Sequence, residues 1–371
     1  MKKVIILIFL LIKISGIYNP IYSSTTSHFH LRSVRERDFL LSNSNKVKNN
    51  HVELSDLTFI GNPDTTVYSF ESNIKINQIS ISDSTDLYVG DSTSKSLYYC
   101  SILPEQSPKG VMVLLCGTWE TTLHVLQSNT KLIQQAHEHQ IAVIIPSINQ
   151  RLSLNTSVLH FLNTVFADAI RKYRLPADKF ILGGLSMGGI FSLRYAEFSA
   201  EDSSLTVIQP KAVFSVDGPT DLENLYYSFK RRFNNPRNAN KGEAEYAIKE
   251  FEKFMGGSPE EYQNQYIRYS TFSKSEEDGG NAKYLLNLPV RIYNDLDVNW
   301  WIENRGNDLY DMNALDQSAF INHLIGNGNK KAEFINALGK GYRLEGNRHP
   351  HSWSIVDPEE CISWILKSLQ E

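Results

Sequence analysis

Hydrophobic and polar residues change their arrangement near residue 104 of this 371-residue chain. Before that point, short alternating or apolar runs are separated by Asn, Asp, Gly and Ser, a pattern typical of antiparallel strands. After it, near-continuous apolar runs alternate with segments of helical periodicity, which predicts a parallel sheet covered on both faces. The antiparallel strands are expected at residues 66–70, 74–81, 87–89 and 97–103.

The part of the chain after residue 104 predicts five apolar strands and one further strand that could lie in either of two places. The five are expected at residues 111–115, 141–145, 180–182, 212–216 and 290–293. The further strand is expected at 332–337 or at 341–344.

Helical periodicity appears between these strands and again at the end of the chain. Two helices are expected at residues 121–137 and 157–173. The last helix has its own start signal, with Asp357 as N-cap, Pro358 at the first position and Glu360 three residues after the cap.

The interval from residue 222 to 287 interrupts the alternation, because it is far longer than one crossover helix requires. It holds a helical stretch at 243–255 and the basic cluster Lys230-Arg231-Arg232, which we interpret as a solvated face; a role in binding acidic substrates is the alternative. We interpret the whole interval as a helical cap inserted over the edge of the sheet. The predicted fold class is therefore α/β, a mostly parallel doubly wound sheet with N-terminal antiparallel strands and a cap insertion.

The N-terminus predicts export. Lys2-Lys3 precedes an unbroken apolar run at residues 4–12, which is too short to span a bilayer and fits the two leading regions of a secretory signal. We expect a signal peptide at 1–23, a polar disordered linker at 24–50 and a folded domain at 51–371. The mature protein would then be secreted or periplasmic without a stable membrane span; an uncleaved anchor is the alternative.

Composition narrows the class of protein only slightly. The net charge is −4, with no long run of one sign, which argues against nucleic-acid binding. The three cysteines do not describe a disulfide framework. We expect buried free thiols at Cys100 and Cys116, which lie on apolar runs; a bridge between them is the alternative.

The stretch from Gly183 to Gly189 carries the candidate chemistry. Within it, Gly184 to Gly188 reads G-x-S-x-G, the sharp strand-to-helix turn that exposes a serine hydroxyl. An apolar strand precedes it and a helical pattern follows, and the extra glycines allow a close approach of helix to strand. A phosphate-binding loop would need a Lys-Ser/Thr ending, which is absent. We therefore predict that Ser186 is a nucleophile.

A serine nucleophile needs a base, and with this turn the expected order is Ser, then acid, then His. His349 and His351 lie in a loop just before the last helix, which is the position expected of the base. We prefer His351, with His349 as the alternative. Two histidines two residues apart could also bind a metal, but no carboxylate or cysteine cluster completes such a site, so no metal is expected.

Three aspartates compete for the role of the acid. Asp297 follows the strand at 290–293 by several residues and is our first choice. Asp295 lies closer to the end of that strand, where it could simply cap the turn. Asp217 directly follows the strand at 212–216, one strand earlier, and is the other alternative.

An oxyanion formed by attack of the serine needs two backbone donors. The N–H of Met187, at the start of the helix after Ser186, is the first candidate, and the N–H of Thr118, after the turn residue Gly117, is the second. Three tryptophans flank these loops and are candidates either for walls of a substrate pocket or for packing against the cap: Trp119, Trp300 and Trp301.

Three segments together resemble the α/β-hydrolase superfamily. They are the turn around Ser186, the strand and loop at 114–118 and the ending His351-Ser352-Trp353, while residues 175–184 are similar to esterases and serine-peptidase-like hydrolases. The resemblance covers about residues 95–371. It departs at Cys116, where many members have His before the oxyanion glycine, and at Asn294, which replaces the usual glycine of the acid loop.

The resemblance implies an α/β-hydrolase fold and acyl transfer to water through a covalent acyl-enzyme, with no metal or organic cofactor. It does not fix the substrate, since one fold carries many activities. We expect a secreted serine hydrolase that cleaves a carboxylic ester of a small-molecule or acylated substrate. The alternatives are a serine peptidase of the same fold and a non-catalytic binding protein with an α/β-hydrolase fold.

Overall fold

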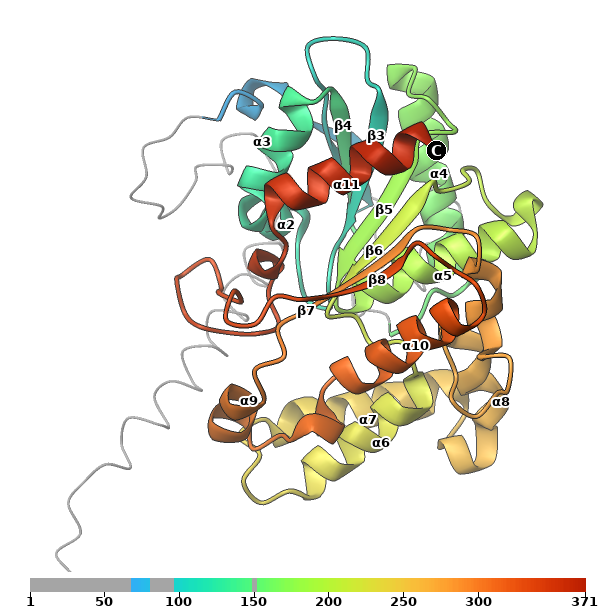
Figure 1. The fold of residues 1–371 in the computed structure, drawn as a ribbon, viewed down its shortest axis with the longest axis vertical. Coiled ribbons are helices and arrows are strands. Elements are labelled where there is room, and N and C mark those ends of the chain that lie inside the picture. Colours follow the sequence, from blue (N-terminus) through green and yellow to red (C-terminus); the bar gives the residue numbers. More distant parts are fainter. Residues whose placement is uncertain (1–67, 81–96, 149–151) are drawn as a thin grey trace, which may run out of the picture. The chain divides into compact units, whose positions relative to one another are not determined.

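The structure is a computed structural model that describes residues 68–80, 97–148 and 152–371 (Figure 1). The expected signal peptide at 1–23, the linker at 24–50 and the strand at 87–89 lie outside these residues. So do the first residues of the expected strand at 66–70.

The described residues form one eight-stranded sheet with the order β1-β2-β4-β3-β5-β6-β7-β8. Its strands are β1 Ile74–Gln78, β2 Tyr98–Ile102, β3 Gly110–Leu115, β4 Ile141–Pro146, β5 Phe180–Leu185, β6 Ala212–Val216, β7 Val290–Asn294 and β8 Ala332–Asn336. Strand β2 pairs antiparallel with β1 and with β4, and all other neighbours are parallel. The sheet is therefore mostly parallel, with antiparallel strands at its N-terminal edge, as the sequence predicts.

The sheet shows where the further strand lies and whether the expected strand at 66–70 forms. The further strand is at 332–336, which pairs with β7, whereas 341–344 contributes only an isolated bridge between Tyr342 and Arg348. The expectation of a strand at 66–70 is wrong where it can be compared, because Tyr68 to Phe70 form a turn that leads into a short 3-10 helix. The Tyr68 and Phe70 rings stack there at 5.6 Å, and the buried Phe70 ring packs in one apolar cluster with strands β1 and β2.

The helices fill the connections between the strands. The α-helices are α2 Thr122–Ser128, α3 Thr130–Glu138, α4 Thr156–Tyr173, α5 Met187–Glu201, α6 Leu222–Asn234, α7 Lys241–Met255, α8 Pro259–Tyr269, α9 Val298–Arg305, α10 Ala314–Gly326 and α11 Pro358–Gln370. The 3-10 helices are η2 Glu71–Asn73, η4 Ser203–Leu205, η5 Gly280–Leu285, η6 Leu309–Asp311 and η7 Trp353–Ile355. Asp357 caps α11 as predicted, accepting a hydrogen bond from the Glu360 N–H at 3.2 Å.

The predicted helix at 121–137 is two helices that meet at Asn129. The Asn129 side-chain amide donates a hydrogen bond to the Val125 carbonyl at 2.8 Å. Asparagine competes in this way for backbone groups that a continuous helix would use, and its φ of −118° leaves the helical region.

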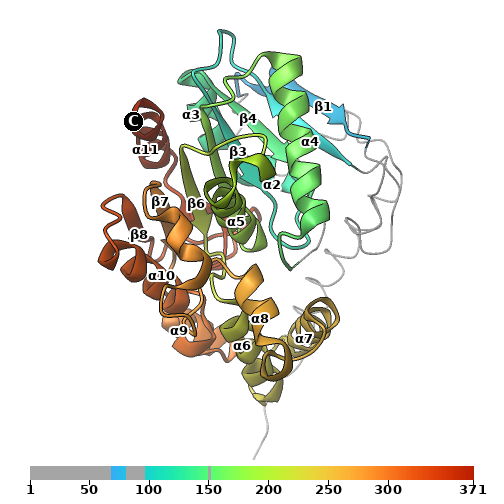
Figure 2. The same cartoon turned by 90° about the vertical axis from the view of Figure 1, so that its right-hand side faces the viewer.

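Helices cover both faces of the sheet (Figures 1 and 2). Alternate residues of each strand point to opposite faces. In β3, Val111 and Val113 pack in one buried cluster with α4 and α5, whereas Met112 and Leu114 pack in another with α2, α3 and α11. This two-sided burial explains why the strands read as continuous apolar runs.

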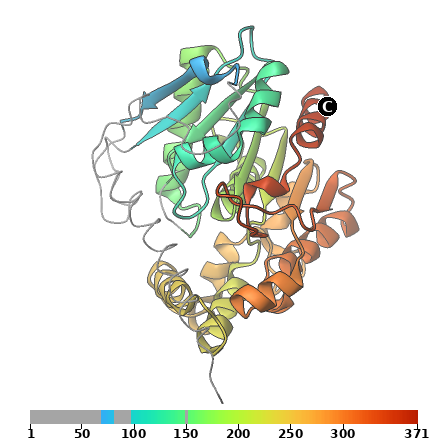
Figure 3. The same cartoon turned by 90° about the vertical axis from the view of Figure 1, so that its left-hand side faces the viewer.

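The interval at 222–287 is helical. It contributes α6, α7, α8 and η5, and it starts just beyond the carboxyl end of β6. Helices α6 and α7 of this interval, together with α9, lie past one end of the sheet (Figures 2 and 3), whereas α10 packs on β7 and β8. The carboxyl ends of the parallel strands therefore face the cap.

All three cysteines are free and buried, as expected for Cys100 and Cys116. Burial raises the pKa of the Cys100 thiol to about 11 and that of the Cys361 thiol to about 12. Neither thiol is therefore ionised at neutral pH, which fits a packing role. Over the ranges that the structure describes, no helix combines the length and the hydropathy needed to cross a membrane.

Candidate active site

Ser186 lies in the turn between β5 and α5 with φ 55° and ψ −120°. A positive φ is unfavourable for a residue with a side chain and is found mainly where the surrounding structure enforces it. Here the Ser186 N–H donates to the Val216 carbonyl at 2.9 Å, which ties the turn to the end of β6. The strained turn holds the serine at the carboxyl end of the sheet, where its side chain is partly exposed.

The glycines on each side of Ser186 are required by the packing of the turn. A Cβ atom on Gly184 would lie 2.2 Å from the carbonyl of Gly188, and one on Gly188 would lie 2.2 Å from the Leu115 carbonyl. Both distances are far below any van der Waals contact and involve backbone atoms that cannot move aside. The G-x-S-x-G pattern is therefore a steric requirement of this strand–turn–helix.

His351 and Asp217 form a close pair next to this turn. His351 Nδ1 lies 2.6 Å from Asp217 Oδ2, and both side chains are largely buried, with relative exposures of 22% and 7%. An ionised carboxylate only accepts hydrogen bonds, so Nδ1 carries the proton that it donates to Asp217. In the neutral imidazole, Nε2 is then the nitrogen that can accept a proton from another group.

Asp217 is held in place by three side-chain amides, one from β7 and two from the start of α10. The Asn294 Nδ2 atom donates to Asp217 Oδ1 at 2.7 Å, and Asn313 Nδ2 donates to the Asp217 carbonyl at 2.8 Å. Gln317 Nε2 lies 3.4 Å from the same carboxylate and donates to the Gly218 carbonyl at 2.9 Å. These contacts fix the carboxylate while leaving Oδ2 for the histidine.

The choice of Asp297 as the acid is wrong in this structure. Asp297 is the N-cap of α9, accepting from the Trp300 N–H at 3.0 Å, and its other oxygen pairs with Arg348 Nη2 at 2.9 Å. Its carboxylate therefore points to a helix end and a guanidinium, not to either histidine. Asp217, the alternative one strand earlier, is the candidate acid that contacts His351.

Asp295, the third candidate acid, also bonds to groups other than the histidines. It accepts hydrogen bonds from the N–H groups of Gly339 at 3.0 Å and Gly341 at 2.8 Å, and it pairs with Arg348 Nη1 at 2.8 Å. Arg348 precedes His351 by three residues. Asp295 and Asp297 therefore hold the histidine loop through Arg348, while Asp217 contacts the histidine itself.

His349, the alternative base, lies in a different environment from His351. Its ring is buried 4.8 Å from the Trp300 ring and 5.7 Å from the Trp301 ring, and its Nε2 lies 3.0 Å from Arg305 Nη2. Burial, then the nearby Arg343 and Arg305 guanidinium groups, lowers the pKa of His349 far below its usual value. It remains neutral and packed, which is unsuitable for a base that must cycle its charge.

The two predicted oxyanion donors, Met187 and Thr118, follow the carboxyl ends of β5 and β3. Met187 is the first residue of α5, where N–H groups have no partner within the helix. In the oxyanion turn, which we define as residues 117–120, the Gly117 N–H is taken by Glu120 Oε2 at 2.7 Å. That leaves the Thr118 N–H, which makes no hydrogen bond within the described part of the chain, as the donor that this turn can offer.

The three predicted tryptophans do not form one wall. Trp300 and Trp301 lie on α9 and pack on His349. Trp119, at φ 68° in the oxyanion turn, is 49% exposed and lies 5.5 Å from the Tyr246 ring of cap helix α7. Of the three, Trp119 is therefore the one that joins the oxyanion turn to the cap.

Some residues of this site were not identified from the sequence. Asn313 and Gln317 lie about a hundred residues after Asp217 and become its partners only when α10 packs beside the strand ends. Asn294 was noticed as a departure from the family pattern but not as a partner of an acid. Glu120 was missed entirely, although a carboxylate three residues after Gly117 is the spacing of a side chain that closes a turn.

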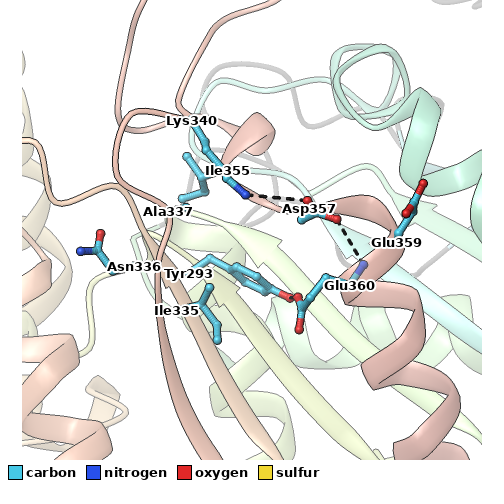
Figure 4. Close-up of a pocket in the computed structure, with 9 residues that line it drawn as sticks. All are labelled: Tyr293, Ile335, Asn336, Ala337, Lys340, Ile355, Asp357, Glu359 and Glu360. Atoms are coloured by element: carbon cyan, nitrogen blue, oxygen red, sulfur yellow. Dashed lines mark hydrogen bonds and ion pairs between the residues drawn. The ribbon is translucent and has the colours of Figure 1, made fainter.

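Two surface pockets lie apart from these residues. One, of about 360 Å³, is bordered by β7, β8 and the start of α11 and includes Tyr293, Lys340 and Asp357 (Figure 4). The other, of about 560 Å³, lies among the cap helices. Neither is lined by Ser186, Asp217 or His351. Among the residues that the structure describes, no group of three or more His, Cys, Asp or Glu side chains is placed to hold a metal ion.

No protein-family model and no curated protein matches this sequence. Solved structures do match it, at low identity. An acylaminoacyl peptidase from Pyrococcus horikoshii is 14% identical over 74% of this chain with a TM-score of 0.47, and this chain spans 40% of its length. A Staphylococcus aureus protein assigned as an esterase is 9% identical, with coverage of 89% and 90% and a TM-score of 0.49.

An S-formylglutathione hydrolase from Agrobacterium tumefaciens gives a similar result. It is 14% identical, with 80% of this chain and 94% of that chain covered and a TM-score of 0.46. Such likenesses concern the fold alone. The strand order, the serine turn after β5 and the helices on both faces make this an α/β-hydrolase fold.

Proposed function

We propose that this protein is a serine hydrolase that cleaves a carboxylic ester through Ser186, His351 and Asp217. The observation that carries the proposal is the 2.6 Å contact between His351 Nδ1 and Asp217 Oδ2, at the same end of the sheet as the strained serine turn. The pair leaves the histidine with a free acceptor nitrogen, which is the property a general base needs.

The reaction follows from the roles of these atoms. Ser186 Oγ attacks the ester carbonyl carbon while His351 Nε2 takes its proton, and Asp217 stabilises the imidazolium that forms. The N–H groups of Met187 and Thr118 donate to the oxygen that gains negative charge. His351 then protonates the departing alcohol, and the acyl group stays on Ser186.

The second half of the reaction repeats these roles with water. His351 deprotonates a water molecule that attacks the acyl carbon, and the returning proton releases Ser186 and a carboxylic acid. In the structure, the Ser186 hydroxyl makes no hydrogen bond to His351 among the described residues. Such contacts often tighten only when substrate is bound, so the arrangement is compatible with catalysis.

The proposed substrate is a small-molecule or acylated ester, and the proposed site of action lies outside the cytoplasm. Trp119 and Tyr246 support the first point, since they place aromatic rings beside the oxyanion turn where an acyl or alcohol group would lie. The charged and apolar residues at 2–12 support the second, as a signal for export.

Labelling with a fluorophosphonate probe tests the proposed nucleophile. The wild-type protein should be labelled, whereas Ser186→Ala should not and His351→Ala should react far more slowly. Equal labelling of wild type and Ser186→Ala would refute the assignment. A panel of acyl esters and aminoacyl amides then separates an esterase from a peptidase, and complete inertness of the wild type towards both panels and the probe would indicate a binding protein.

A further inference from the structure

Glu120 is a buried carboxylate that the reaction described above does not use. Its side chain is 8% exposed, and it lies in the oxyanion turn next to the exposed Trp119. Burying an ionised carboxylate is costly unless hydrogen bonds and charges compensate for the lost water. The partners of Glu120 therefore indicate what the residue does.

The first partner is the oxyanion turn itself. Glu120 Oε2 accepts from the Gly117 N–H at 2.7 Å, and the Glu120 N–H donates to the Gly117 carbonyl at 3.1 Å. These two bonds close the turn around Trp119, whose φ of 68° is unfavourable for a residue with a side chain. A Cβ on Gly117 would lie 3.2 Å from the Leu185 carbonyl, so the turn also runs against the residue that precedes Ser186.

The second partner belongs to the histidine loop. Trp353 Nε1 lies 3.2 Å from both carboxylate oxygens of Glu120, and the Trp353 side chain is buried. Trp353 follows His351 by two residues. One carboxylate thus connects the turn that carries the oxyanion donor to the loop that carries the base.

The third partner keeps this carboxylate ionised. His124 Nδ1, on α2, lies 3.0 Å from Glu120 Oε1. Burial by itself would raise the pKa of Glu120, but the hydrogen bonds from His124, Gly117 and Trp353 outweigh it and hold that pKa below its usual value. Glu120 is therefore ionised at neutral pH, where it accepts hydrogen bonds from His124, Gly117 and Trp353.

We propose that Glu120 is a positioning residue of the hydrolase: it holds the oxyanion turn and the histidine loop in a fixed mutual position by accepting hydrogen bonds from the Gly117 N–H and the Trp353 indole. It also occupies the Gly117 N–H, so that the Thr118 N–H is left as the donor for the reacting oxygen. This inference rests on the proposed function of the same site.

Kinetics of Glu120→Gln test the proposal. The glutamine amide keeps the shape but presents N–H donors to partners that are themselves donors. Because an oxyanion donor acts mainly in the transition state, we expect kcat for p-nitrophenyl butyrate to fall about 10- to 100-fold, with KM changed less than about threefold. Trp353→Phe removes only the link to the histidine loop and should lower kcat about 3- to 10-fold.

Glu197→Gln is the control, because Glu197 is a fully buried acid on α5, with its pKa raised by burial to about 8, that bonds to Arg194 away from the oxyanion turn. It should lower the melting temperature without lowering kcat. A kcat of Glu120→Gln within twofold of wild type would overturn the proposal. The proposal would also be overturned if Glu197→Gln and Glu120→Gln lowered the melting temperature equally and lowered kcat by the same factor.

Hydrogen exchange gives a readout that does not depend on activity. In Glu120→Gln, amides at 116–121 and at 350–354 should both exchange faster than in wild type, and those of α4 should not. Unchanged exchange in either segment would overturn the positioning role. If wild type neither turns over ester nor reacts with the probe while both segments loosen, the proposed function fails and the link made by Glu120 stands.

Discussion

His349 and His351 lie two residues apart on one loop, yet their surroundings differ in charge. His351 faces the Asp217 carboxylate, whereas His349 packs on two tryptophan rings and has the Arg305 and Arg343 guanidinium groups beside its nitrogens. A carboxylate favours the protonated imidazole and a guanidinium disfavours it. The comparison shows that the partners supplied by other elements, not the local sequence, determine which charged groups face each histidine.

Removing the charge of Asp217, the partner of His351, should have the largest effect on kcat. We expect Asp217→Asn to lower kcat by about 10³- to 10⁴-fold, because the amide cannot stabilise the imidazolium and favours the wrong tautomer. Melting temperature and kcat should be measured together, since Asn294 and Gln317 also bond to this carboxylate. An active Asp217→Asn enzyme would contradict the role of Asp217.

Loosening the loop without touching either histidine should have an intermediate effect. Arg348 bonds to both Asp295 and Asp297, so Arg348→Ala releases the anchor of the segment that carries His351. We expect kcat to fall about 10- to 100-fold through misplacement of the base, with a lower melting temperature. Arg348→Lys should restore only part of the loss, because a lysine cannot bond to two carboxylates in the same geometry.

The same substitution at Asp297, the other candidate acid, tests whether Asp217 and Asp297 differ in role. Asp297→Asn keeps the cap of α9 and weakens one of the bonds to Arg348, so kcat should fall less than about fivefold. The ratio of the effects of Asp217→Asn and Asp297→Asn then measures how far the two aspartates differ in role. Loss of activity in Asp297→Asn alone would show that the acid is at the end of β7 after all.

His349 should affect the pH dependence of stability more than activity. Its folded pKa is lowered, so below the unfolded value of about 6.5 the unfolded chain binds one more proton and the free energy of unfolding falls by about 1.4 kcal/mol per pH unit. His349→Phe should remove this slope between about pH 6.5 and pH 5 in urea unfolding, while kcat at pH 7.5 changes little.

The exposed His139 provides a control, because His139→Gln should leave the slope as it is in wild type. An identical slope in wild type and His349→Phe would show that His349 is protonated in the folded protein. That result would remove the contrast between the two histidines.

Much of the fold could be predicted because it depends on local patterns. Apolar strands buried on both faces read as continuous runs, and the positions of Ser186 and His351 follow from a tight turn and from the start of the last helix. Periodicity predicts one helix at 121–137 where the structure has two, because a break at a single residue, Asn129, leaves the spacing of apolar residues on either side intact.

The acid could not be chosen from the sequence for a different reason. Asp217, Asp295 and Asp297 are the same chemical group at similar distances from strand ends. They differ only in which donors reach them: side-chain amides from α10 and β7 for Asp217, and backbone N–H groups and Arg348 for the other two. Those partners lie up to about a hundred residues away, where no spacing rule applies.

The contact between Trp119 and Tyr246 also makes the intrinsic fluorescence of Trp119 a probe of the space beside the oxyanion turn. Trp119 is half exposed, belongs to the oxyanion turn and touches the cap, whereas Trp353 and Trp364 are buried. A ligand that enters between α7 and the turn must alter the solvent around the Trp119 indole. Its emission, isolated by comparison with Trp119→Phe, should therefore report occupancy of the site during a titration without any attached dye.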